Sequence, residues 1–76
     1  MSQTKKVTGD YTIDSTTDIN LTAASQVIVT GSPLRLASFT TTERDALSGT
    51  ANGDLIYNVT LSKIQAYAGG VWVNLH

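Results

Sequence analysis

The sequence predicts a mainly β protein in which one short helix separates two β-structured parts. Pairs of apolar residues recur about every eight residues in the first half of the chain. A helix-capping signature begins at Thr40. Three alternating segments separated by turn signals fill the rest of the chain. We therefore expect a β-structured stalk over residues 1–38 and a helix plus an antiparallel meander, the head, over residues 39–76.

The size and composition of the chain limit how it can be stabilised. With 76 residues it is one domain at most, and a domain of this size buries only about 60% of its unfolded surface. The chain has no cysteine and one histidine, His76, so it lacks disulfides and the usual zinc ligands. Self-association is therefore the expected source of additional stability.

The charge and hydropathy patterns exclude several kinds of partner. The net charge is −1 and only 14% of residues are charged, so the basic surface of a nucleic-acid binder is missing. No apolar run approaches the roughly 20 residues that span a bilayer. The start, "MSQTKKVTGDY", has no apolar stretch after its lysines, which predicts that it is not a secretory signal. We expect neither nucleic-acid nor membrane binding.

The predicted stalk rests on four apolar–x–apolar pairs, each with the period of a strand that buries one face. The first three pairs are eight residues apart, and the fourth follows after seven, with the slip at "TGSP". Polar, turn-prone segments connect them. The pairs are Tyr11 and Ile13, Ile19 and Leu21, Val27 and Val29, and Leu34 and Leu36.

An eight-residue repeat suits a narrow structure in which each unit is one short strand and one corner. A single stack leaves strand edges and the apolar column open, and repeats in general need neighbours. We expect three intertwined chains forming a β-prism or triple β-helix; two chains, a single-chain sandwich or a chance pattern are the alternatives. The predicted homotrimer interface consists of Ile13, Ile19, Leu21, Val27, Val29, Leu34, Leu36, Phe39 and Leu47.

A short helix is predicted over residues 40–48. Thr40 and Glu43 have the spacing of a capping box, and Gly49 stands where a left-handed C-terminal residue is common. One or two turns are too short to persist without packing. We therefore expect the helix to close the end of the stalk, with Phe39 and Leu47 covering its interior.

The predicted meander has strands at "LIYNV", "KIQAYA" and "VWVNL", preceded by an Asn-Gly turn signal and interrupted by "GG". It carries three aromatic residues, Tyr57, Tyr67 and Trp72. They are expected to form the core of the meander or, if exposed, a platform for a sugar or receptor. Trp72 is the strongest single candidate for such a contact.

The run "TTTERDAL…NGDLIYN…K-x-Q-x-Y…G-x-W-x-x-L" resembles a C-terminal segment of bacteriophage tail-fibre and other virion structural proteins. The resemblance implies a trimeric component of the virion, assembled in the host bacterial cytoplasm with other virion proteins, whose knob follows a β-structured stalk. It covers about half of the chain. The residues that carry it are Thr40–Leu47, Asn52–Asn58, Lys63, Gln65, Tyr67, Gly70, Trp72 and Leu75.

We therefore expect a structural fibre, spike or tip module that acts by homotrimeric assembly. The alternative is a receptor- or glycan-binding tip that uses Tyr57, Tyr67 and Trp72. An enzyme is not expected, because the serines have no partner base other than His76, and Glu43 and Asp45 point to different sides of a helix.

Two further groups of residues are weaker candidates for a site. Asp10, Asp14 and Asp18 are spaced by four, so copies meeting at a threefold axis could hold Ca²⁺, although aspartate is also a common corner residue. No metal or cofactor is expected on balance. Asp54 is the third acidic residue of the second half, after Glu43 and Asp45. Arg35 and Arg44 are expected to be solvated or paired between chains. Asn20 and Asn58 match the glycosylation pattern.

Overall fold

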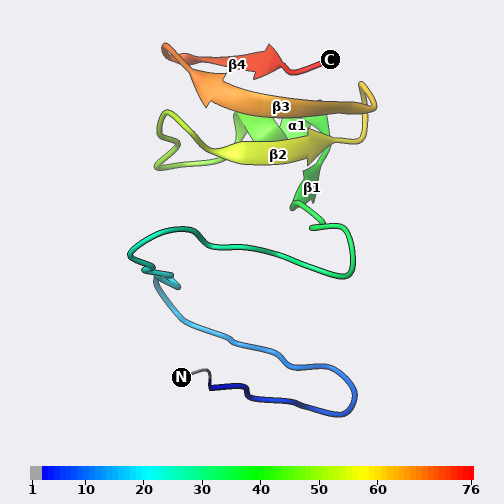
Figure 1. The fold of residues 1–76 in the computed structure, drawn as a ribbon. Helices are drawn as coiled ribbons and strands as arrows, with labels where there is room; N and C mark the ends of the chain where they lie inside the picture. The colour runs from blue at the N-terminus through cyan, green and yellow to red at the C-terminus, as the bar shows by residue number, and fades with distance from the viewer. Residues whose placement is uncertain (1–2) are drawn as a thin grey trace.

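The computed structural model describes residues 3–76 and is mainly β (Figure 1). The described residues hold one four-stranded sheet and one short helix, both in the second half of the chain. This confirms the predicted class. The elements are β1 (Ser38–Phe39), α1 (Thr41–Asp45), β2 (Leu55–Asn58), β3 (Lys63–Ala68) and β4 (Val71–Asn74).

The sheet has the order β1-β2-β3-β4 and mixed direction. Strands β2, β3 and β4 form the predicted antiparallel meander, with Ile56 opposite Gln65 and Tyr67 opposite Trp72. The parallel edge strand β1 was not predicted. It is only two residues long, which is too short to show the alternating pattern that predicts a strand. Tyr57 N–H donates to the carbonyl of Ala37, and Val59 N–H to that of Phe39, both at 2.9 Å.

Two different turns connect the strands of the meander. Gly69 and Gly70 join β3 to β4 with φ angles of 62° and 84°, as the two central positions of a type I′ hairpin turn require. Residues 59–62 join β2 to β3, and Ser62 there has a φ of 55°. The Asn-Gly signal forms a separate turn before β2, closed by a 3.1 Å bond from Asp54 N–H to the carbonyl of Ala51.

Helix α1 begins as the sequence predicts. The hydroxyl of Thr40 accepts from Glu43 N–H at 3.1 Å, and the Glu43 carboxylate accepts from Thr40 N–H at 2.8 Å, which completes the capping box. The helix ends at Asp45 with Ala46 as its C-cap, earlier than predicted. Gly49 has a φ of 72° but lies in the following loop, so its assignment to the helix end was wrong.

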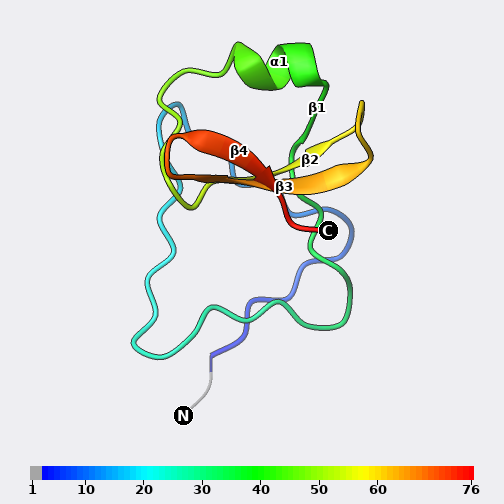
Figure 2. The same cartoon turned by 90° about the horizontal axis from the view of Figure 1, so that it is seen from above.

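Residues 3–37 contain no helix or strand, but the chain bends at a regular interval. The bends fall at residues 8–9, 16–17, 24–25 and 31–32, which is the eight, eight and seven spacing of the apolar pairs. In Figure 1 the chain runs back and forth beneath the sheet between these bends. From above, its successive segments point in different directions rather than forming one flat ribbon (Figure 2).

A conventional apolar core is almost missing. Among the described residues, Ile56 is the one apolar side chain classed as buried, with 5% of its surface exposed. The other two buried residues are polar: Asn58 is 0% exposed and Gln65 is 2% exposed. The head is therefore organised around amides rather than around a cluster of aliphatic side chains.

The capping box gives a direct test of the head's local structure. Replacing Thr40 by Ala removes the hydroxyl acceptor and should lower the free energy of unfolding by about 1 kcal/mol, whereas Thr40→Ser should retain most of it. The measurement is urea denaturation at one fixed protein concentration. Thr42→Ala serves as the control, because Thr42 lies exposed inside the helix. Equal losses for Thr40→Ala and Thr40→Ser would contradict the capping role.

Candidate functional site

The two faces of the head sheet have opposite chemical character. Alternation along each strand, combined with the register between strands, assigns every side chain to one face. Side-chain bonds from α1 reach Asn58 and Gln65, so their face is the one that the helix covers, as Figure 2 also shows. The helix-covered face comprises Phe39, Ile56, Asn58, Lys63, Gln65, Tyr67, Trp72 and Asn74.

The side chain of Asn58 is at the centre of the helix-covered face. Its Oδ1 accepts from the N–H groups of Thr60 at 3.0 Å and Leu61 at 3.1 Å, which shapes the turn after β2. Its Nδ2 donates to Thr41 Oγ1 at 3.1 Å and to Gln65 Oε1 at 3.0 Å. One amide thus joins the helix start, a turn and the neighbouring strand.

Gln65 extends this network across β3. Its Oε1 also accepts from Arg44 Nη1 at 3.0 Å, and its Nε2 donates to Asn74 Oδ1 on β4 at 2.6 Å. Among the described residues, no buried side-chain nitrogen or oxygen lacks a partner. A buried polar network that is fully satisfied in this way fixes one arrangement of the elements.

Arg44 is part of the head and is not free for another chain or for solvent, contrary to the expectation. Besides Gln65 it contacts the carboxylate of Asp45, with Nη2 at 2.8 Å. That carboxylate is largely exposed, so the ion pair itself contributes little to stability. The bond to buried Gln65 joins the helix to β3, beside the bond from Asn58 to Thr41.

The other face of the sheet, which we term the open face, is not covered by the helix and is almost entirely apolar. It carries no charged side chain. Most of its aliphatic side chains are exposed, including Val71 and Val73 on β4. The open face consists of Ser38, Leu55, Tyr57, Ile64, Ala66, Ala68, Val71 and Val73.

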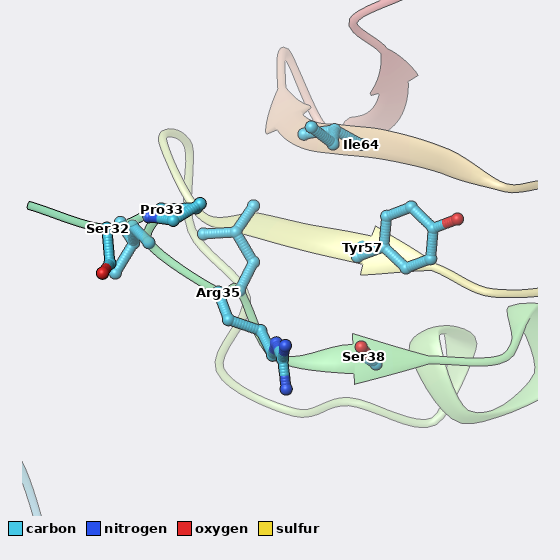
Figure 3. A pocket seen from close by; sticks show the side chains of 8 residues that line it. Ser32, Pro33, Arg35, Ser38, Tyr57 and Ile64 are labelled. Atoms are coloured by element: carbon cyan, nitrogen blue, oxygen red, sulfur yellow. The ribbon is translucent and has the colours of Figure 1, made fainter.

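A pocket of about 700 Å³ adjoins the open face where the stalk enters the head. Figure 3 shows Pro33 and Arg35 on the incoming chain, with the Arg35 side chain directed towards β1, and Tyr57 on β2 and Ile64 on β3 farther along the pocket. Its lining is formed by Ser32, Pro33, Leu34, Arg35, Leu36, Ser38, Tyr57 and Ile64. The open face and the end of the stalk therefore form one continuous apolar surface.

The residues predicted for the trimer interface lie in three environments. Six of them, in the stalk, are more than half exposed: Ile13, Ile19, Leu21, Val27, Val29 and Leu34. Leu36 is half-buried beside the pocket. Phe39 is half-buried on the helix-covered face, next to Asn58. Leu47 lies just beyond the helix and is exposed.

The three candidate receptor-contact residues do not share one surface. Tyr67 and Trp72 are cross-strand partners with ring centroids 5.2 Å apart in an edge-to-face arrangement. The hydroxyl of Tyr67 donates to the carbonyl of Gly70 at 3.0 Å. Tyr57 lies on the open face instead. All three rings are half-buried, so a three-ring platform is not assembled within one chain.

The acidic residues considered for catalysis each have a local partner. Glu43 completes the capping box, Asp45 contacts Arg44, and Asp54 accepts from Ala51 N–H at 3.0 Å. His76 Nε2 accepts from Ile64 N–H at 3.0 Å. No acid–base pair is evident in this arrangement.

Within residues 3–76, no group of three or more acidic, histidine or cysteine side chains could hold a metal ion, and this includes Asp10, Asp14 and Asp18. No helix in the same range is long and apolar enough to cross a membrane.

The structural role of the buried amides was not predicted from the sequence. Asn58 attracted notice only as a match to the glycosylation pattern, and its complete burial removes its side chain from reach of a glycan. A usable signal existed. Each of the three strands carries one amide, at Asn58, Gln65 and Asn74, and the residues that flank it in the strand are apolar or small.

Comparison with family models, with curated proteins and with solved structures finds no match for this chain.

The central role of Asn58 can be measured. Asn58→Ala leaves the buried amide of Gln65 and the N–H groups of Thr60 and Leu61 without their partner, so it should lower the free energy of unfolding by on the order of 3 kcal/mol. Asn20→Ala is the matched control, because Asn20 is exposed in the stalk and should change stability by less than about 0.5 kcal/mol. Similar denaturation curves for the two variants would show that the network does not hold the head together.

Proposed function

We propose that this chain is a structural module of a bacteriophage fibre, spike or tip, and that it acts by assembling into a homotrimer. The observation that carries the proposal is the exposure of the stalk's apolar pairs. Leu21, for example, is 71% exposed and Leu34 is 67% exposed. Each such side chain gains roughly 1.5–3 kcal/mol when it is fully buried, so a regular column of them is a strong drive for association.

The regular bends of residues 3–37 favour chains that wind around one another over a collapse of the chain without regular structure. Because corners and apolar pairs share one spacing, each unit presents its apolar pair at an equivalent position. Copies that wind around a common axis would bury these positions together and pair the open backbone edges. We take the proposed stalk to be a short triple β-helix or β-prism for this reason.

The proposed head follows the resemblance to the C-terminal segment of phage fibre proteins. The residues that carry this resemblance include Asn58, Gln65 and Trp72, and the first two are buried in the amide network. Because members of this residue pattern are buried inside the head, the pattern agrees with a structural role. The proposed location is the virion, beside other virion proteins, after assembly in the bacterial cytoplasm.

A receptor- or glycan-binding tip is the second candidate. The half-exposed edge of the Tyr67–Trp72 pair is the observation that favours it. The assembly proposal is better supported, because these rings already contact one another and Tyr57 lies on the other face of the sheet. The proposed role requires no catalytic group and no cofactor.

The trimer proposal predicts a molecular mass. Static light scattering of the full chain should give about three times 8.1 kDa over a wide concentration range. Replacing both Ile19 and Val27 by Asp should reduce that mass, because charges would enter the buried column. Asn20→Asp is the control for added charge between two apolar positions. A wild-type chain that is stable and monomeric would refute the proposal.

Trp72 separates the two candidate functions. In the structural role, Trp72→Ala removes an aromatic contact and should cost about 2 kcal/mol of stability, and Trp72→Phe should recover most of it. Thermal melting measures this effect, and adsorption to host cells is measured in parallel. Unchanged melting together with lost adsorption would instead assign Trp72 to receptor binding.

A further inference from the structure

The open face of the head sheet is an exposed apolar surface that the proposed stalk does not use. Leu55, Ile64 and Val73 are each more than one-third exposed there. A sheet normally buries its apolar face and leaves its polar face to solvent. Here the helix covers the amides and leaves the aliphatic side chains uncovered.

We propose that the open face, with the adjoining pocket, is filled by the same surface of neighbouring copies of this chain. This inference rests on the proposed homotrimer and extends it from the stalk to the head. The subunit contact then runs without interruption from Leu34 and Leu36 through the pocket to Tyr57, Ile64 and Val73. Three heads would be packed together by their sheets, with their α1 helices on the outside.

The chemistry of the surface favours a copy of the chain over another occupant. No charged side chain stands on the open face, and Arg35 is the one charged residue in the pocket lining. A partner recognised through charge would have almost nothing to contact. An aliphatic surface is buried favourably against another aliphatic surface, and the open face of a neighbouring copy provides one.

The area of the open face also favours a copy of this chain as the molecule that covers it. Four strands about 4.8 Å apart and a few residues long present a face on the order of 300 Å². Stable interfaces bury about 800 Å² on each partner, so the sheet alone is too small. Its continuation into the exposed stalk supplies the remainder. A copy of this chain carries both surfaces in the same relative position.

The contact proposed here uses the side chains of the edge strands rather than their backbone edges. Strand β1 is only two residues long, and β4 forms the opposite edge. Face-to-face packing therefore leaves the β4 backbone free. Strand addition at β4 is the competing arrangement, and it would leave the side chains of the open face uncovered.

The natural sequence has no cysteine, so a single introduced cysteine reports on its own position. The reactivity of that thiol in the assembled full chain therefore tests the proposal. Three single variants are compared: Val73→Cys on the open face, Val27→Cys in the stalk, and Leu61→Cys in the β2–β3 turn. Val73 and Leu61 are similarly exposed in one chain, at 42% and 46%. The probe is a small aromatic disulfide reagent, with unfolded protein in urea as the reference.

We expect Val73→Cys and Val27→Cys to react at least about tenfold more slowly than Leu61→Cys, because covered thiols react only when the interface opens. In urea the three rates should agree. A trimer with protected Val27→Cys but reactive Val73→Cys would overturn this inference alone. A monomer by light scattering, with all three thiols reactive, would overturn the proposed function and the inference with it.

A charge variant provides a second readout. Val73→Asp should lower the mass measured by light scattering or shift the dissociation midpoint at least about tenfold in concentration, whereas Leu61→Asp should leave both unchanged. If Val73→Asp fails to fold, the cysteine variant still decides, because Val→Cys preserves size and apolar character. A Val73→Asp trimer as stable as wild type would contradict the proposal.

Discussion

The head depends on the hydrogen bonds of one buried amide, the side chain of Asn58. It joins the turn after β2, the first residue of α1 and the side chain of Gln65. Hydrogen bonds contribute modestly to net stability but are costly to leave unmade when buried. The network therefore selects one arrangement of helix and sheet strongly, even though it buries little apolar surface.

This arrangement reverses the usual distribution of side chains in a small sheet protein. The amides lie under the helix, and the aliphatic residues of β2, β3 and β4 other than Ile56 lie on the open face. The stalk shows the same outward exposure of apolar pairs. A single copy is thus shaped by specific polar contacts, while the proposed assembly supplies the hydrophobic burial that the copy lacks.

The sequence predicted those features that local signals encode. The capping box of Thr40 and Glu43, the Gly69-Gly70 turn and the three antiparallel strands all follow from short-range rules. The spacing of the stalk bends was also anticipated by the apolar pairs.

Other features depend on contacts between distant residues and carry little local signal. Strand β1 is held by residues nearly 20 positions away, and the partners of Arg44 and Asn58 come from different elements. Strand alternation alone does not say which face the helix covers. The core of the meander was therefore expected at Tyr57, Tyr67 and Trp72, and the buried role of Asn58 and Gln65 went unrecognised.

The narrow attachment of the stalk to the sheet has a mechanical consequence. The incoming chain joins through β1, whose pairing with β2 includes the two 2.9 Å bonds from Tyr57 and Val59. Tension applied along the stalk must pass through this joint before it reaches the meander. This joint would yield first under load, so β1 would separate from β2 while β2, β3 and β4 stay paired, and it would pair again when the load is removed.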